Sequence, residues 1–157
     1  MDIKKLGNSL LIFTVNRLIE ILGIFIFCFG VLLFVSLVTY SPSDPNFIFP
    51  ENTEIKNILG FQGSYMADLF FQSSGLVAFL IPFTFIFTGI NIFRRKEIFL
   101  FIENTFFITL YALVGTLFFG FYYENSFSFY INGNGGFIGN YLNKTSLVNV
   151  ILSLIHI

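Results

Sequence analysis

Long apolar runs separated by short polar stretches make up most of the chain. Residues 69–93 contain no charged side chain and are followed directly by Arg94, Arg95 and Lys96. A helix rises about 1.5 Å per residue, so a run of this length crosses a hydrocarbon core of roughly 30 Å with some tilt. The pattern therefore predicts a membrane-spanning helix over residues 69–93.

Three further apolar runs predict additional spans. Residues 18–40 are apolar apart from Glu20, residues 104–123 are uncharged, and residues 147–157 form an apolar tail. The tail is long enough to reach only about half-way across a bilayer. The first run is longer than a signal-peptide core and lacks a small-residue cleavage site, so we expect it to be retained. The sequence thus predicts an all-α, polytopic transmembrane helix bundle, with four spans of which the fourth is truncated, in a single membrane domain over residues 1–157.

Charge supports this interpretation and gives the bundle a direction. Only 11% of residues are charged, against about 25% in soluble domains. Because Lys and Arg close to a span resist translocation, Arg94, Arg95 and Lys96 predict a cytoplasmic turn, and the basic N-terminus is predicted to be cytoplasmic too. Glu20 follows Arg17 by three residues, so we expect an ion pair at the membrane edge; a buried functional carboxylate is the alternative.

Prolines and glycines mark the expected breaks in the first half of the chain. Pro42 and Pro45 exclude a continuing helix after residue 40, and Asp44 offers a capping oxygen, so a rigid corner is expected there. In the polar loop that follows, residues 53–60 are predicted to form a short interfacial helix that ends at Gly60.

The second span carries its own signals. Gly75 and Gly89 are predicted to allow close helix approach, and Pro82 predicts a kink. Asp68 is expected near the start of this helix, where the helix dipole favours an acid, and a proton-relay carboxylate is the alternative. The short turn that follows Lys96 predicts that spans two and three pack as an antiparallel hairpin.

Catalytic chemistry finds no support in the sequence. A phosphate-binding loop needs G-x-x-x-x-G-K-[ST], but Asn143 stands where the second glycine must precede Lys144 and Thr145. The sole histidine is His156, so we interpret Ser36, Ser73 and Ser74 as helix–helix hydrogen-bonding residues rather than nucleophiles. Cys28 is the single cysteine, which excludes a disulfide within the chain. We therefore expect no enzyme activity and no catalytic, cofactor-binding or metal-binding residue.

Two sequence features resemble a known family. One is the corner Tyr40-Ser41-Pro42-Ser43-Asp44-Pro45, and the other is the series that opens the second span, with Ala67-Asp68, Gln72 and Gly75 followed by Pro82 and Gly89. Together with the glycine cluster at residues 133–139, they resemble the N-terminal four-helix membrane module of FtsK/SpoIIIE-type DNA translocases.

The resemblance implies a function and a place in the cell. In that family the module anchors a hexameric ATPase at the division septum, the motor pumps chromosomal DNA, and the membrane part contacts other division proteins. The implied partners are the lipid bilayer, further copies of the chain and division-site membrane proteins, with DNA, ATP and Mg²⁺ reached only through a motor that is missing from these residues. The implied location is the bacterial inner membrane, multi-pass, with the N-terminus cytoplasmic.

The sequence therefore favours a membrane-anchoring, oligomerisation and partner-docking module of a septal DNA translocase for cell division and chromosome segregation. A small transporter or channel subunit of the inner membrane is the alternative, with Gln72, Thr88 and Asn91 along a polar path. The structural and docking candidates are Tyr40, Ser41, Pro42, Asp44, Pro45, Asp68, Gly75, Pro82, Gly133, Gly135, Gly136 and Gly139.

Overall fold

The structure is a computed structural model that describes residues 3–45, 54–123 and 132–145. Its elements are all helical, as the sequence predicts, and no strand occurs in these ranges. In chain order they are α1 (Ile3–Val38), α2 (Gly60–Ser74), the 3-10 helix η1 (Gly75–Phe79), α3 (Leu80–Arg95), α4 (Phe99–Tyr122) and α5 (Gly136–Asn143).

Three stretches of the described chain are long and apolar enough to cross a membrane. They are Gly7–Val38, Gly60–Arg95 and Phe99–Tyr122. The predicted fourth span, residues 147–157, lies outside the described residues. The helical membrane bundle predicted from the sequence is thus confirmed.

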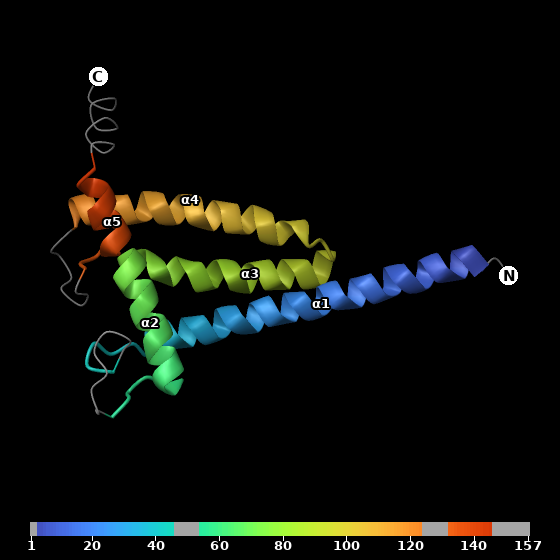
Figure 1. The fold of residues 1–157 in the computed structure, drawn as a ribbon, viewed down its shortest axis with the longest axis horizontal. Coiled ribbons are helices and arrows are strands. Elements are labelled where there is room, and N and C mark those ends of the chain that lie inside the picture. The colour runs from blue at the N-terminus through green and yellow to red at the C-terminus, as the bar shows by residue number, and fades with distance from the viewer. Residues whose placement is uncertain (1–2, 46–53, 124–131, 146–157) are drawn as a thin grey trace, which may run out of the picture.

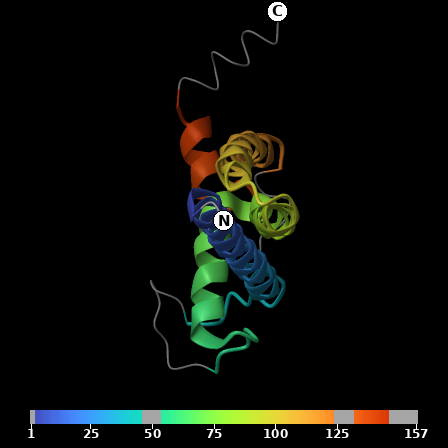
Figure 2. The ribbon, with the colours of Figure 1, turned by 90° about the vertical axis from the view of Figure 1, so that its right-hand side faces the viewer.

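Helices α1, α3 and α4 run side by side, while α2 lies across one end of them (Figure 1). Figure 2 views the long helices end-on and shows α2 and α5 extended in the plane of the picture. Helix α3 lies between α1 and α4 and contacts both of them. The chain reverses direction between α3 and α4 after Lys96, so the predicted antiparallel hairpin is present.

The bend between α2 and α3 differs from the prediction of one continuous helix over residues 69–93. Helix α2 ends at Ser74 and Gly75 has a φ of 58°, so the chain turns there and not at Pro82. Pro82 lies in the first turn of α3, where a missing N–H costs little. The part that runs beside α1, residues 75–95, spans about 34 Å, enough for a hydrocarbon core.

Two local predictions are wrong. Residues 54–59 form turns and irregular chain rather than an interfacial helix, and Gly60 begins α2 instead of ending a helix. Asp68 is not at a helix start, because α2 begins eight residues before it. The short helix α5, which begins within the glycine cluster at Gly136, was not predicted.

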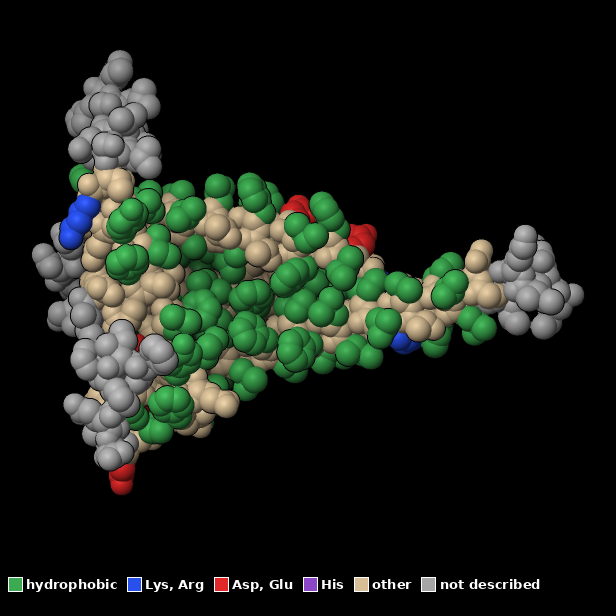
Figure 3. All heavy atoms as spheres, viewed as in Figure 1, with side chains coloured by type: hydrophobic (Ala, Val, Ile, Leu, Met, Phe, Trp, Pro, Cys, Tyr) green, Lys and Arg blue, Asp and Glu red, His purple; other side chains and the backbone are tan. Residues whose placement is uncertain are grey.

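The sides of the bundle are apolar. Large hydrophobic side chains are exposed along all three long helices, including Phe25 on α1, Phe87 on α3 and Phe106 on α4. Figure 3 shows hydrophobic side chains over most of the visible length of the bundle, with few charged ones. Soluble monomers rarely expose so much continuous apolar surface, so these sides are suited to lipid.

Candidate docking surface

One end of the bundle gathers most of the predicted candidates. We call it the corner end: residues 39–45, residues 54–59, α2, η1 and residues 132–145, which lie together in Figure 1. We call the opposite end, with Arg17 and residues 94–96, the basic end. Helix α2 packs on the end of α1 and also contacts α5, so the corner end is one packed unit.

Asp44 organises the chain that leads into α2. Its carboxylate is buried, with 4% of the residue exposed, and it accepts the backbone N–H of Lys56 at 3.0 Å and of Asn57 at 2.9 Å. Residues twelve and thirteen positions further along the chain are thereby held against the corner. The capping oxygen predicted at Asp44 is therefore used across the loop.

Asn57 connects this loop to α1. Its side-chain Nδ2 donates to the carbonyl of Ser36 at 2.9 Å, and its Oδ1 accepts the backbone N–H of Leu59 at 3.1 Å. The hydroxyl of Ser36 in turn donates to the carbonyl of Gly63 in α2 at 2.6 Å. Ser36 is thus the helix–helix hydrogen-bonding residue predicted, whereas Ser73 donates to Phe70 of its own helix.

Asp68 is a buried carboxylate on the inner face of α2. The hydroxyl of Tyr40 donates to its Oδ1 at 3.1 Å, and Nε2 of Gln72 donates to the same oxygen at 3.3 Å. Asp68 is 7% exposed. These hydrogen bonds join the corner at Tyr40 to α2, so the predicted candidates Tyr40, Asp44 and Asp68 belong to one structure.

A second joint forms where the chain bends at Gly75. The backbone N–H of Leu76 donates to the carbonyl of Asn134 at 3.0 Å. A Cβ added at Gly75 would lie 1.9 Å from that same carbonyl oxygen, and one added at Gly136 would lie 2.5 Å from the carbonyl oxygen of Ser73. Both positions therefore require glycine, and residues far apart in the sequence meet here backbone to backbone.

The rest of the glycine cluster packs on α4. Cβ atoms added at Gly135 and Gly139 would lie 2.6 Å and 2.3 Å from the carbonyl oxygen of Thr116. Asn132 donates through Nδ2 to Oε1 of Gln72 at 3.0 Å, which ties the same segment to α2. The glycine cluster is thus a packed contact between α5, α4 and the bend.

At the basic end, Glu20 lies between two cations. It forms the predicted ion pair with Arg17, and Nζ of Lys96 lies 2.9 Å from its second oxygen. The second contact joins α1 to the end of α3, which sequence spacing alone did not indicate. Arg94 and Arg95 are exposed.

Most predicted docking candidates lie inside the module. Asp44, Pro45, Asp68, Gly75, Pro82, Gly135, Gly136 and Gly139 are buried, whereas Pro42 is exposed. Tyr40, Ser41 and Gly133 are half-buried. These residues therefore shape the corner end, and their role in docking stays a prediction.

The outer surface of the corner end consists of other residues. Ile58 is 75% exposed and Phe61 is 50% exposed, and Ile55 and Lys56 beside them are also exposed. We call Ile55, Ile58 and Phe61 the corner patch. Ile55 and Ile58 belong to the segment that the sequence predicts as an interfacial helix. The sequence does not single out Asn57 or Asn134, which hold the two joints together. In the described ranges no group of three or more His, Cys, Asp or Glu residues is arranged to hold a metal ion.

Helical spans joined by a packed, polar corner end define a polytopic membrane module, and comparison with known proteins identifies its family. Residues 15–153 match the family described as the 4TM region of DNA translocase FtsK/SpoIIIE. The chain belongs to this family.

Curated relatives agree with the family match. The chain is 24% identical over 110 residues to a DNA translocase FtsK of Rickettsia typhi, covering 68% of this chain and 15% of that protein. It is 37% identical over 60 residues to the DNA translocase FtsK of Rickettsia bellii, covering 38% of this chain and 8% of the relative. The corresponding protein of Pseudomonas putida is 33% identical over 66 residues, covering 41% and 8%. The matches thus span a small part of each relative, and no solved structure matches the chain.

Proposed function

We propose that this chain is the membrane anchor of a septal DNA translocase, and that its corner end docks a division-site membrane protein. The relatives are named DNA translocases, and the chain matches 15% or less of the length of the three relatives described above. The proposal assigns ATP use, Mg²⁺ binding and DNA movement to other parts of such proteins. The matched residues hold the translocase in the inner membrane, and copies of this membrane module associate with one another.

The observation that carries the docking proposal is the construction of the corner patch. Residues 54–59, which precede α2, form no helix. Their backbone is held by hydrogen bonds from Lys56 and Asn57 to the carboxylate of Asp44, and by the bond from the Asn57 side chain to Ser36 of α1. Ile58 is exposed on this hydrogen-bonded segment, and Phe61 is exposed beside it on the first turn of α2. Preorganised apolar side chains of this kind bind a partner with a smaller loss of conformational entropy.

Replacing Asp44 by Asn tests this support. The amide presents an NH₂ group where a carboxylate oxygen accepts a backbone N–H, so one buried donor loses its partner at a cost of about 1–3 kcal/mol. We expect faster proteolysis of the loop before α2 and a several-fold loss of a fluorescent fusion from the septum, with membrane insertion unchanged.

Glu54→Gln is the matched control, because it removes one negative charge from an exposed residue of the same loop. Direct replacement of Ile58 and Phe61 by Ser should reduce septal localisation without exposing the loop to protease. Normal localisation of both the Asp44→Asn protein and the double-serine protein would remove the corner end from the docking proposal.

The proposal also places the basic end in the cytoplasm. Lys and Arg beside spans are retained on that side, and α3 ends with Arg94 and Arg95, directly followed by Lys96. Reporter fusions after Arg95 and after Asn52 are expected to report the cytoplasm and the periplasm, respectively. An external signal from the fusion at Arg95 would reverse the orientation.

A further inference from the structure

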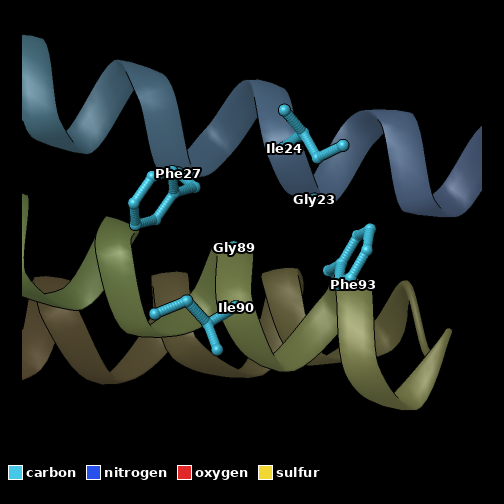
Figure 4. Close-up of a pocket in the computed structure, with 6 residues that line it drawn as sticks. All are labelled: Gly23, Ile24, Phe27, Gly89, Ile90 and Phe93. Carbon is cyan, nitrogen blue, oxygen red and sulfur yellow. The ribbon is translucent and has the colours of Figure 1, made fainter.

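The crossing of α1 and α3 leaves an apolar groove on the side of the bundle. The groove has a volume of about 210 Å³ and is lined by Gly23, Ile24, Phe27, Gly89, Ile90 and Phe93. Figure 4 shows Gly23 and Gly89 facing each other between α1 and α3, with the rings of Phe27 and Phe93 on either side of them. Ile24 is 50% exposed and Phe93 is 46% exposed, so the groove opens to the surroundings of the bundle.

The glycines create this groove because they let the two backbones touch. A Cβ added at Gly23 would lie 2.8 Å from the backbone nitrogen of Phe93, and one added at Gly89 would lie 2.5 Å from that of Phe27. Neither position has room for a side chain. The groove beside the two glycines is bordered by the side chains of Ile24, Phe27, Ile90 and Phe93. No polar side chain lines it.

The antiparallel register continues from the groove to the basic end. Gly23 lies against Phe93. Three residues closer to the basic end on each side, Glu20 of α1 pairs with Lys96, which directly follows α3. Three residues of helix correspond to about 4.5 Å. The groove therefore ends about one turn from the charged groups at the end of the two helices.

Cations outnumber acids where the groove ends. Glu20 is shared between Arg17 and Lys96, and among the described residues no ion pair is recorded for Arg94 or Arg95, which directly follow Phe93. The other acids of this end are Glu97 in the turn and Glu103 on α4, and α3 separates α4 from α1.

We propose that this groove binds an anionic phospholipid, with one acyl chain over the Gly23–Gly89 crossing and the headgroup against Arg94 and Arg95. An apolar channel that runs into a basic rim matches the two parts of such a lipid. A zwitterionic lipid offers the same acyl chain without the net negative charge. The site is independent of docking at the corner end, because it lies at the opposite end of the helices.

The chain contains no tryptophan, so one introduced tryptophan reports on its own surroundings. The Phe93→Trp protein is purified and reconstituted in mixed bilayers. Brominated phosphatidylglycerol is expected to quench its tryptophan at least about fivefold more effectively per mole than brominated phosphatidylcholine. A fivefold ratio corresponds to the attraction of one basic residue, about 1 kcal/mol. Phe106→Trp is the matched control, because it makes the same replacement at an exposed position on α4. Its quenching should show no preference between the two lipids.

Replacing Arg94 and Arg95 by Gln in the Phe93→Trp protein is expected to abolish the preference while quenching by both lipids persists. Ile90→Trp provides a second sensor in the same groove should Phe93→Trp disturb the fold, as judged by circular dichroism. Equal quenching by the two lipids at residues 90 and 93 would show bulk lipid only and overturn the proposal. Quenching by neither lipid would show that protein covers the groove, and this result would also overturn the proposal.

Discussion

Replacement of Gly75 by Ala is expected to lower the free energy of unfolding by about 3 kcal/mol or more. Two separate costs add. Overpacking against a backbone costs about 1–3 kcal/mol, and a backbone conformation reserved for glycine costs about 1–3 kcal/mol more. Gly75 incurs both, because its φ is 58° and the new Cβ would lie 1.9 Å from the carbonyl oxygen of Asn134.

Gly60→Ala separates the two costs. Gly60 also has a positive φ, 67°, but nothing lies within 4 Å of the position of its Cβ. It should therefore show the conformational cost alone, about 1 kcal/mol. In thermal melts followed by circular dichroism, we expect Tm to fall by roughly 6–12 °C for Gly75→Ala and by roughly 2–4 °C for Gly60→Ala.

Equal shifts for the two variants would contradict the joint between Gly75 and Asn134. The same joint supplies a second, local readout. Because the backbone N–H of Leu76 donates to Asn134, its hydrogen exchange should accelerate in the Gly75→Ala protein. Exchange at Leu76 should be unchanged in the Gly60→Ala protein.

Replacement of Gly89 by Ala is expected to weaken the contact between α1 and α3 by about 2 kcal/mol, within the usual range for overpacking. Its new Cβ would lie 2.5 Å from the backbone nitrogen of Phe27 and 2.6 Å from the carbonyl oxygen of Gly23. Backbone atoms of a long helix cannot move individually, so the two helices must separate along their whole contact. Tm is the measurement, as above.

Gly115→Ala is the control for this prediction. It also adds a methyl group to a membrane-span helix and so gains the same helix propensity, up to about 1 kcal/mol. Its Cβ would meet only the side chain of Val77, with the nearest atom at 2.9 Å, and a side chain can shift. A Gly89→Ala protein as stable as the Gly115→Ala protein would mean that the helices do not cross at Gly89.

The spans were predictable because lipid imposes a simple rule on the sequence. A helix that crosses a bilayer must be apolar over most of its length, so α1, α3 and α4 each overlap one of the apolar runs. The pair of Arg17 and Glu20 was also predictable, since it depends on helical spacing alone. The pair of Glu20 and Lys96 depends on the register between two helices, which no local pattern contains.

The bend at Gly75 was missed for a physical reason. Proline is the stronger helix breaker in water, so Pro82 attracted the prediction, yet in the first turn of α3 its missing N–H matters little. What bends the chain is a tertiary contact: the carbonyl of Asn134 occupies the space that any side chain at residue 75 would need. That contact joins residues almost sixty positions apart.

Burial was the least predictable property of the candidate site. Asp44 and Asp68 are acids in a polar stretch, and composition alone favours an exposed surface for both. Each is instead enclosed by hydrogen bonds from groups that the fold brings to it, the N–H of Asn57 for Asp44 and the hydroxyl of Tyr40 for Asp68. Both acids were candidates from the sequence, but only the fold shows that they face inward.

The crosswise position of α2 gives this membrane module a defined response to mechanical load. Helix α2 lies across one end of the long helices, so a bilayer crossed by these helices would have α2 along its surface. It carries Asp68 and Gln72, and Ser36 holds it to α1. A pull toward the basic end would drag the Asp68 carboxylate into hydrocarbon, where a charged side chain costs about 2.5–3.5 kcal/mol. A push in the other direction meets no such barrier from α2, so the module resists force unequally in the two directions.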